Sequence, residues 1–162
     1  MASLTMSLDQ DAVLAEIHIA APQKQVFQAI ADPNQVKKWW GQKGRYRHTE
    51  SESDFRPGGK WRTSGVGDDG KEYEVGGEYI EIEPPWLLVY TWVASFDGRT
   101  PTTVRWELSP HEDGTLVKLQ HSGFAQKPEA SKHYSGGWPT VLGWMQAYVE
   151  RGETVETRNA AS

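Results

Sequence analysis

Residues 86–93 read WLLVYTWV, and both alternating sets of side chains in this run are mostly apolar. A β-strand turns successive side chains toward opposite faces of its sheet. A short apolar run rich in aromatic and branched residues therefore predicts a strand that is covered on both faces. Other parts of the chain must pack on each side of it.

Turn signals divide the neighbouring sequence into further strand-like segments. Asp69-Gly70, Asp97-Gly98 and Asp113-Gly114 favour tight hairpin turns, and Pro57-Gly58-Gly59 and Glu83-Pro84-Pro85 supply further breaks. We expect an antiparallel meander of six strands. They fall near residues 45–56, 59–66, 71–83, 86–96, 101–109 and 115–123.

In the third strand of this meander the apolar positions change parity. Tyr73 and Val75 share one face, whereas Ile80 and Ile82 fall on the other. An extra residue around Gly76 to Tyr79 would produce this change, and such a β-bulge bends a sheet. We therefore expect a curved sheet.

One strand and two short helices precede the meander. Residues 13–19 alternate between a more apolar and a less apolar set, which predicts the first strand. Pro22 suits the first position of a short helix that ends near Asp32. Asp32 then caps a second short helix, which begins at Pro33 and ends at Gly41.

A long amphipathic helix follows the meander. Pro139 near its start and Gly152 near its end mark its boundaries, although Gly136-Gly137 leave an earlier beginning open. This helix supplies one of the two covers that residues 86–93 require. Its apolar stripe consists of Trp138, Val141, Leu142, Met145, Tyr148 and Val149.

Length and composition indicate one cytoplasmic domain. The 162 residues are enough for a single core, which we place at residues 12–151, with flexible tails at 1–11 and 153–162. The absence of cysteine excludes disulfides, thiol nucleophiles and cysteinyl metal sites. Neither a signal peptide nor an apolar run long enough to insert in a membrane is present, so we expect no membrane insertion.

The formal net charge of −5 argues against nucleic acid as the main partner. Residues 37–49 are an exception, because this segment contains five cations and no carboxylate. Aromatic rings are interspersed among these cations. The segment is compatible with nucleic acid, with solvated charge beside a cavity, or with a rim that attracts an acidic amphiphile. Its cations are Lys37, Lys38, Lys43, Arg45 and Arg47.

Eight tryptophans are more than a core of this size requires. An indole ring has a large apolar surface and one N–H donor that needs a partner. The surplus indicates cavity walls, while ordinary core packing remains an alternative for each ring.

Several short motifs, taken in order, resemble the Hsp90-ATPase-activator-like family of the START-like superfamily. The resemblance spans about residues 12–151. The motifs are Ala21-Pro22, Val26-Phe27, Trp39-Trp40-Gly41, Phe55-Arg56-Pro57-Gly58-Gly59, Glu83-Pro84-Pro85, Leu87 with Val89-Tyr90-Thr91-Trp92, His121-Ser122-Gly123-Phe124 and Gly137-Trp138.

This resemblance implies an α+β helix-grip fold. A curved antiparallel sheet of about seven strands wraps a long C-terminal helix, with two short helices after the first strand and a hydrophobic cavity between sheet and helix. The superfamily includes lipid carriers, polyketide cyclases, hormone receptors and co-chaperone domains, so the fold leaves the activity open. Chaperone activators of this name carry an additional N-terminal domain, for which residues 1–11 leave no room.

Aromatic and aliphatic residues on the concave face of the sheet and on the helix are the candidate cavity walls. Which parity of each strand faces inward is open at this point. The candidates are Trp39, Phe55, Trp61, Tyr90, Trp92, Trp106, Trp138, Leu142 and Met145.

Catalytic signals are sparse. Arg105 and His121 are weak candidates for an anion anchor or a general acid in the cavity. The glycines of residues 65–70 match a dinucleotide fingerprint, but a strand follows instead of a helix, so we interpret them as a hairpin turn. No pair among the five histidines has metal-ligand spacing. We expect no metal and no other cofactor.

These observations favour a binding protein that sequesters a hydrophobic or amphipathic small molecule. Two alternatives remain. The first is a cavity enzyme of the polyketide cyclase or hydrolase type, which would use Arg105 or His121. The second is a chaperone-related module that binds a protein partner through its outer surface.

Overall fold

A computed structural model describes residues 3–6, 12–42, 46–67, 69–95, 101–124 and 128–157. The side chains within 3–6, 42–48 and 128–136 lie outside this description. The Asp97-Gly98 turn and the side chains of Lys43, Arg45 and Arg47 are therefore not described.

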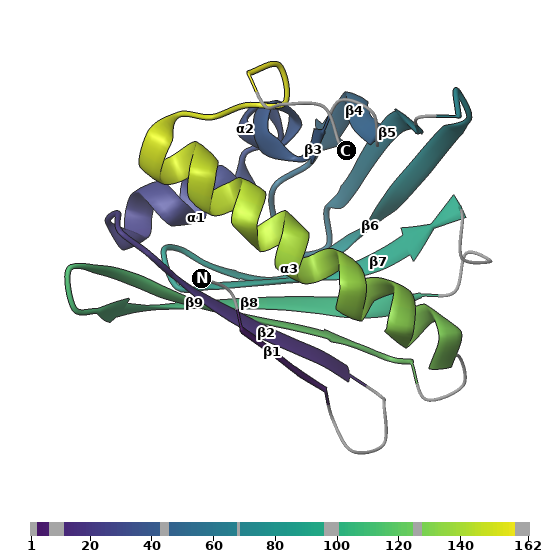
Figure 1. Cartoon of the computed structure of the whole chain (residues 1–162). Coiled ribbons are helices and arrows are strands. Elements are labelled where there is room, and N and C mark those ends of the chain that lie inside the picture. Colours follow the sequence, from purple (N-terminus) through teal and green to yellow (C-terminus); the bar gives the residue numbers. More distant parts are fainter. Residues whose placement is uncertain are drawn as a thin grey trace.

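The described residues form one antiparallel sheet of nine strands, which curves around a long helix (Figure 1). The strand order is β1-β2-β9-β8-β7-β6-β5-β4-β3. The helix-grip prediction is confirmed. Seven strands match the prediction to within a few residues. They are β2 (Ala12–Ile19), β4 (Tyr46–Ser53), β5 (Lys60–Gly67), β6 (Glu72–Glu83), β7 (Leu87–Ala94), β8 (Thr102–His111) and β9 (Gly114–Ser122).

Two short strands extend the sheet beyond the prediction. β3 (Gly41–Gln42) pairs with β4. β1 (Ser3–Met6) pairs with β2, with Ser3 opposite Glu16 and Met6 opposite Val13, where we expected a flexible tail. The edge of β2 presents backbone donors and acceptors that a neighbouring segment can satisfy, and this pairing is invisible to local sequence signals.

The two short helices are α1 (Gln23–Ala31) and α2 (Pro33–Trp39). Pro22 is the N-cap of α1 and not its first residue, because its backbone is extended. Asp32 caps α2 as predicted, since its Oδ1 accepts a hydrogen bond of 2.9 Å from the Asn34 N–H. The buried face of α1 consists of Val26, Phe27, Ala29 and Ile30.

Helix α3 (Pro128–Arg151) begins well before Pro139, the residue that the sequence pattern places near its start. Pro139 lies inside this helix, although proline has no backbone N–H to donate to the helix hydrogen bonds. Burial of the stripe outweighs that local cost, because Trp138, Leu142 and Met145 are each 2% exposed or less. Figure 1 shows α3 lying diagonally across the concave side of the sheet.

Strand β7 is buried on both faces over its first half, where the four consecutive residues Leu87 to Tyr90 are all buried. Thr91 and Val93 are only partly buried and Trp86 is 45% exposed, so the prediction for residues 86–93 holds in part. The bulge in β6 is also present. Its register against β7 shifts between Tyr79 and Glu81, at the end of the predicted segment. Val75 and Tyr79 are buried before the shift, whereas after it Ile82 lies opposite the buried Leu88 and packs against the core. Ile80, at the shift, is exposed.

The segment after α3 packs back onto α2. Val155 is buried, and its backbone N–H donates a 2.8 Å hydrogen bond to the Lys38 carbonyl. Part of the expected C-terminal tail therefore belongs to the packed structure. No helix among the described residues is both long and apolar enough to cross a membrane.

Gly77 permits a close approach between three strands. It lies opposite Trp61 of β5, whose indole Nε1–H donates a 3.2 Å hydrogen bond to the Thr91 carbonyl of β7. The Glu78 N–H in turn donates to Thr91 Oγ1 at 2.8 Å. A Cβ atom at Gly77 would overlap the Thr91 carbonyl oxygen.

We therefore expect Gly77→Ala to lower the free energy of unfolding by about 2–3 kcal/mol, because backbone atoms must shift. The matched control is Gly143→Ala in α3, where an added Cβ meets nothing within 4 Å. Alanine is the better helix former, so this control should gain about 0.5–1 kcal/mol. Urea unfolding measures both changes. Equal effects of the two substitutions would contradict this account of Gly77.

Candidate functional site

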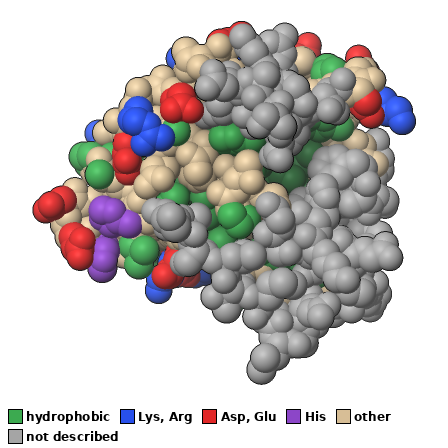
Figure 2. All heavy atoms as spheres, viewed as in Figure 1, with side chains coloured by type: hydrophobic (Ala, Val, Ile, Leu, Met, Phe, Trp, Pro, Cys, Tyr) green, Lys and Arg blue, Asp and Glu red, His purple; other side chains and the backbone are tan. Residues whose placement is uncertain are grey.

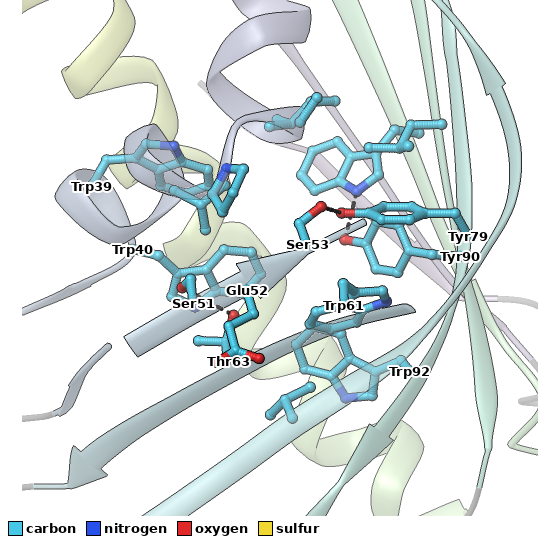
Figure 3. Close-up of a pocket in the computed structure, with 17 residues that line it drawn as sticks. Trp39, Trp40, Ser51, Glu52, Ser53, Trp61, Thr63, Tyr79, Tyr90 and Trp92 are labelled. Atoms are coloured by element: carbon cyan, nitrogen blue, oxygen red, sulfur yellow. Dashed lines mark hydrogen bonds between the residues drawn. The ribbon is translucent and has the colours of Figure 1, made fainter. Parts of the chain in front are cut away.

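The described part of the chain forms a partly open cavity of about 60 Å³ between the α1–α2 pair and the inner face of strands β4 to β8 (Figure 3). Apolar side chains predominate in its wall. The lining residues are Ile30, Ala31, Pro33, Val36, Trp39, Trp40, Ser51, Glu52, Ser53, Trp61, Thr63, Val75, Tyr79, Leu88, Tyr90, Trp92 and Trp106.

Five of the nine candidate wall residues line this cavity, namely Trp39, Trp61, Tyr90, Trp92 and Trp106. Phe55 does not line it. Its ring is 40% exposed and meets Tyr79 edge-on, with 5.1 Å between ring centroids. The other three, Trp138, Leu142 and Met145, are packed in the core beneath α3.

The cavity is thus displaced from its expected place between the sheet and α3. Trp138 fills that space, and its ring lies edge-on to those of Trp40 and Trp106, at centroid distances of 5.6 and 5.7 Å. Large rings that interlock there leave the remaining space closer to α2.

The cavity wall is a continuous cluster of aromatic rings. Trp40 stacks on Trp39 at a centroid distance of 5.3 Å and on Trp92 at 6.0 Å. Trp61 lies edge-on to Tyr90 at 5.1 Å and contacts Trp92 at 5.8 Å. Such offset and edge-on contacts are the favourable arrangements of aromatic pairs, so the wall is a mutually supporting unit.

Trp39 joins the two short helices that form one side of the cavity. Its side chain is fully buried, and its Nε1–H donates a 2.9 Å hydrogen bond to the Ala29 carbonyl in α1. The indole thereby satisfies its own donor and one of the carbonyl groups left open at the end of α1.

Hydroxyl groups form the polar part of the wall. The Ser51 and Thr63 hydroxyls are 3.2 Å apart, and those of Ser53 and Tyr79 are 2.8 Å apart (Figure 3). Burial raises the pKa of Tyr79 above its usual value of 10.0, and the hydrogen bond with Ser53 opposes this shift. The Ser53 and Tyr79 hydroxyls are therefore neutral hydrogen-bonding groups at physiological pH.

The Tyr90 hydroxyl oxygen accepts a 3.0 Å hydrogen bond from the Trp106 Nε1–H. Burial, which is the largest cause, raises the pKa of Tyr90 far above its usual value of 10.0. The phenol keeps its proton and acts as a neutral donor.

His121 belongs to a buried hydrogen-bond chain behind the cavity and does not line it. The Trp138 Nε1–H donates to His121 Nδ1 at 3.0 Å, and His121 Nε2 lies 2.7 Å from Thr102 Oγ1. Thr102 Oγ1 donates to the Trp92 carbonyl at 3.2 Å. Since an indole can only donate, the imidazole proton must be on Nε2.

This arrangement fixes a neutral His121. Protonation of Nδ1 would break the bond from Trp138, and burial lowers the pKa of His121 to about 3. A group with both nitrogens engaged and with this pKa has no proton to give or take near neutral pH. Its geometry is that of a structural residue.

Arg105 lies on the opposite face of the sheet. Its neighbour Val104 pairs with the buried His121, whereas Arg105 pairs with Gln120. The Arg105 guanidinium donates to Glu107 at 2.6 Å in a polar surface depression outside the cavity. One cavity therefore cannot use both Arg105 and His121.

Sequence reasoning missed several wall residues, chiefly Trp40, Val36, Ser53, Thr63 and Tyr79. A usable signal existed for two of them. Trp40 adjoins Trp39 at the end of the predicted second helix, and Tyr79 has the same strand parity as Val75. The hydroxyl residues gave no signal, because serine and threonine alternate with charged residues in many solvent-exposed strands.

The described part of the chain offers no metal centre, since no three His, Cys, Asp or Glu side chains gather there. The predicted hairpin between β5 and β6 is present, and the Gly67 N–H at the end of β5 donates a 2.9 Å hydrogen bond to the Lys71 carbonyl. Acidic and basic side chains are interspersed on the face shown in Figure 2. Lys37 and Lys38 of the basic segment lie in the last turn of α2 and do not line the cavity.

A sequence profile described as "Activator of Hsp90 ATPase homolog 1-like protein" matches residues 20–150. A comparison with curated protein sequences gave no match.

Several solved structures share the fold over nearly the whole chain. A protein from Rhodobacter sphaeroides is 22% identical, with 93% of this chain and 96% of that chain covered and a TM-score of 0.77. CalU16 from Micromonospora echinospora is 22% identical, with 94% and 85% covered and a TM-score of 0.67. DynU16, from the dynemicin biosynthetic locus, is 21% identical, with 92% and 50% covered and a TM-score of 0.73. These likenesses establish the fold.

Proposed function

The chain belongs to the Activator of Hsp90 ATPase homolog 1-like family, and we propose that it binds a small apolar or amphipathic molecule in the cavity between α1–α2 and the sheet. The observation that carries this proposal is the wall of seven aromatic residues around an internal space. They are Trp39, Trp40, Trp61, Tyr79, Tyr90, Trp92 and Trp106.

Concave apolar sites with a few placed polar groups are the usual form of small-molecule sites. The hydroxyls of Ser53, Tyr79 and Tyr90 are such groups. A small-molecule ligand is also supported by DynU16, a protein of the dynemicin biosynthetic locus whose fold this chain shares.

The size of the cavity limits how a ligand enters. An apolar cavity of about 150 Å³ accepts benzene, whereas this one measures about 60 Å³. A ligand of benzene size or larger therefore does not fit wholly inside the cavity unless a wall residue moves. Trp61 is the wall ring suited to move, because it is only partly buried and is held by one 3.2 Å hydrogen bond to the Thr91 carbonyl.

Neither alternative function has comparable support. The cavity-enzyme hypothesis depended on Arg105 or His121, and neither residue lines the cavity. The protein-interaction hypothesis is favoured by the description of the family, which gives no binding surface, and, among the described residues, by the exposed apolar side chains Phe55, Ile80 and Trp86. Single exposed apolar residues are common on monomeric proteins, so these carry no second proposal. A cytoplasmic location stays a prediction.

A substitution that fills the cavity tests the proposal. We expect Val36→Phe to weaken the binding of small aromatic ligands at least about tenfold, because a ring from α2 then occupies their space. Fluorine-detected NMR titration with fluorobenzene derivatives measures the affinity. The mass spectrum of an organic-solvent extract of the purified wild type identifies any natural ligand.

The matched control is Val93→Phe, which places the same ring on the outer face of β7, where Val93 borders a surface groove. This variant should bind like the wild type. Equal affinities of the two variants, or no binding by the wild type, would remove the cavity as the binding site.

A further inference from the structure

The Tyr90 hydroxyl has used only part of its hydrogen-bonding capacity. Its oxygen accepts from the Trp106 Nε1–H at 3.0 Å, and an indole nitrogen can only donate. The hydroxyl hydrogen therefore remains available. Among the residues that the structure describes, the Tyr90 hydroxyl donates no hydrogen bond.

Burial makes this open donor significant. Tyr90 is only 8% exposed, and it lines the cavity. A buried donor without an acceptor costs free energy, and native proteins rarely retain one without a reason. Figure 3 shows the Tyr90 and Tyr79 hydroxyls on the same side of the cavity, and their rings are 6.3 Å apart. This side of an otherwise aromatic wall is therefore suited to an acceptor atom.

The charge of the wall restricts the ligand further. Glu52 is the single charged residue among the described residues of the lining, and its Oε1 lies 3.2 Å from Arg62 Nη2. That pairing directs the carboxylate toward another charged side chain. An anion or a cation in the cavity would lose its hydration without gaining a counter-charge there.

We propose that the cavity selects a neutral, apolar molecule with one carbonyl-type oxygen, which accepts a hydrogen bond from the Tyr90 hydroxyl. This inference rests on the proposed function and names the ligand class of the same site. Trp106 acts as a positioning residue, because its N–H occupies the phenol oxygen and leaves only the hydrogen for the ligand.

Four ligands of nearly the same shape separate the possible chemistries. 4-Fluoroacetophenone carries a carbonyl acceptor, and 4-fluorocumene replaces it with an isopropyl group. 4-Fluorobenzoate is an anion, and 4-fluorophenyltrimethylammonium is a cation. Fluorine-detected NMR measures all four with the wild type. We expect 4-fluoroacetophenone to bind about three- to tenfold more tightly than 4-fluorocumene, as one added hydrogen bond allows, and both ions to bind more weakly than either.

The variant Tyr90→Phe keeps the ring and removes the donor. It should lower the affinity for 4-fluoroacetophenone about three- to tenfold and leave that for 4-fluorocumene unchanged. The matched control is Tyr148→Phe, whose hydroxyl donates to Gln35 Oε1 at 3.2 Å outside the cavity. This control should change neither affinity.

The outcomes separate the two proposals. Equal binding of acetophenone and cumene by the wild type would show that water or nothing meets the Tyr90 hydroxyl, and it would overturn the inference while leaving cavity binding intact. Tighter binding of either ion would also overturn it. No binding of any of the four would instead count against the proposed function. The wild-type comparison decides the matter even if Tyr90→Phe does not fold.

Discussion

Substituting Trp39 by alanine should lower the free energy of unfolding by about 3–5 kcal/mol, which is the usual cost of truncating a fully buried large aromatic side chain. Trp39 has no exposed surface, stacks on Trp40 and bonds the Ala29 carbonyl. Its loss leaves a void and separates α2 from α1. Urea unfolding followed by circular dichroism measures the change.

Two further variants separate the causes. Trp39→Phe retains most of the ring packing and loses the N–H donor, so it should cost less than Trp39→Ala. Trp86→Ala removes the same ring at a site that is 45% exposed and should change stability by less than about 1 kcal/mol. If Trp39→Ala cost no more than Trp86→Ala, the assigned role of Trp39 in holding α1 and α2 together would be wrong.

Acid should destabilise the protein through His121. Burial lowers the pKa of this side chain to about 3, against 6.5 for the exposed residue. Above pH 6.5 the imidazole is neutral in both states, and its environment contributes its full stability. Between pH 6.5 and 3 only the unfolded chain takes up the proton, so stability falls with pH by about 1.4 kcal/mol per unit.

The substitution His121→Gln removes this titration, and its amide can still accept from Trp138 and donate to Thr102. We expect its disadvantage relative to the wild type to shrink by about 3 kcal/mol between pH 6.5 and pH 4. Urea midpoints over that range give the difference. The control is His18→Gln at a partly exposed site, where Nε2 meets the His111 carbonyl at 3.1 Å. Parallel pH profiles of His121→Gln and the wild type would show that the buried imidazole is not the cause.

Local signals were sufficient for most of the sheet. Asp69-Gly70 and the break at Pro84-Pro85 lie between strands of the structure, and Asp113-Gly114 spans the end of the Glu112-Asp113 turn and the first residue of β9. Alternation along residues 13–19 likewise gave β2 within one residue. Turn chemistry and side-chain parity are properties of neighbouring residues, so the sequence carries them directly.

Features that depend on distant contacts were not predictable. The pairing of Ser3–Met6 with β2 joins two segments through backbone groups. The passage of α3 through Gly136 and Pro139 contradicts local helix preference. The position of the cavity depends on how Trp138 fills the space between α3 and the sheet. That packing involves residues far apart in the sequence, so the sequence alone does not reveal it. Five of the nine proposed wall residues nevertheless line the cavity. All five carry large aromatic rings, which reach the cavity from inward-facing positions.

The aromatic cluster also determines how the protein interacts with light. Trp40 lies within about 6 Å, between ring centroids, of Trp39, Trp92 and Trp138. Indoles at this spacing exchange excitation energy, so absorbed light does not stay on the ring that absorbed it. The tryptophan emission is therefore a collective property of the cluster. Replacing one ring changes the spectrum of its neighbours, and an optical titration reports on the cluster as a whole.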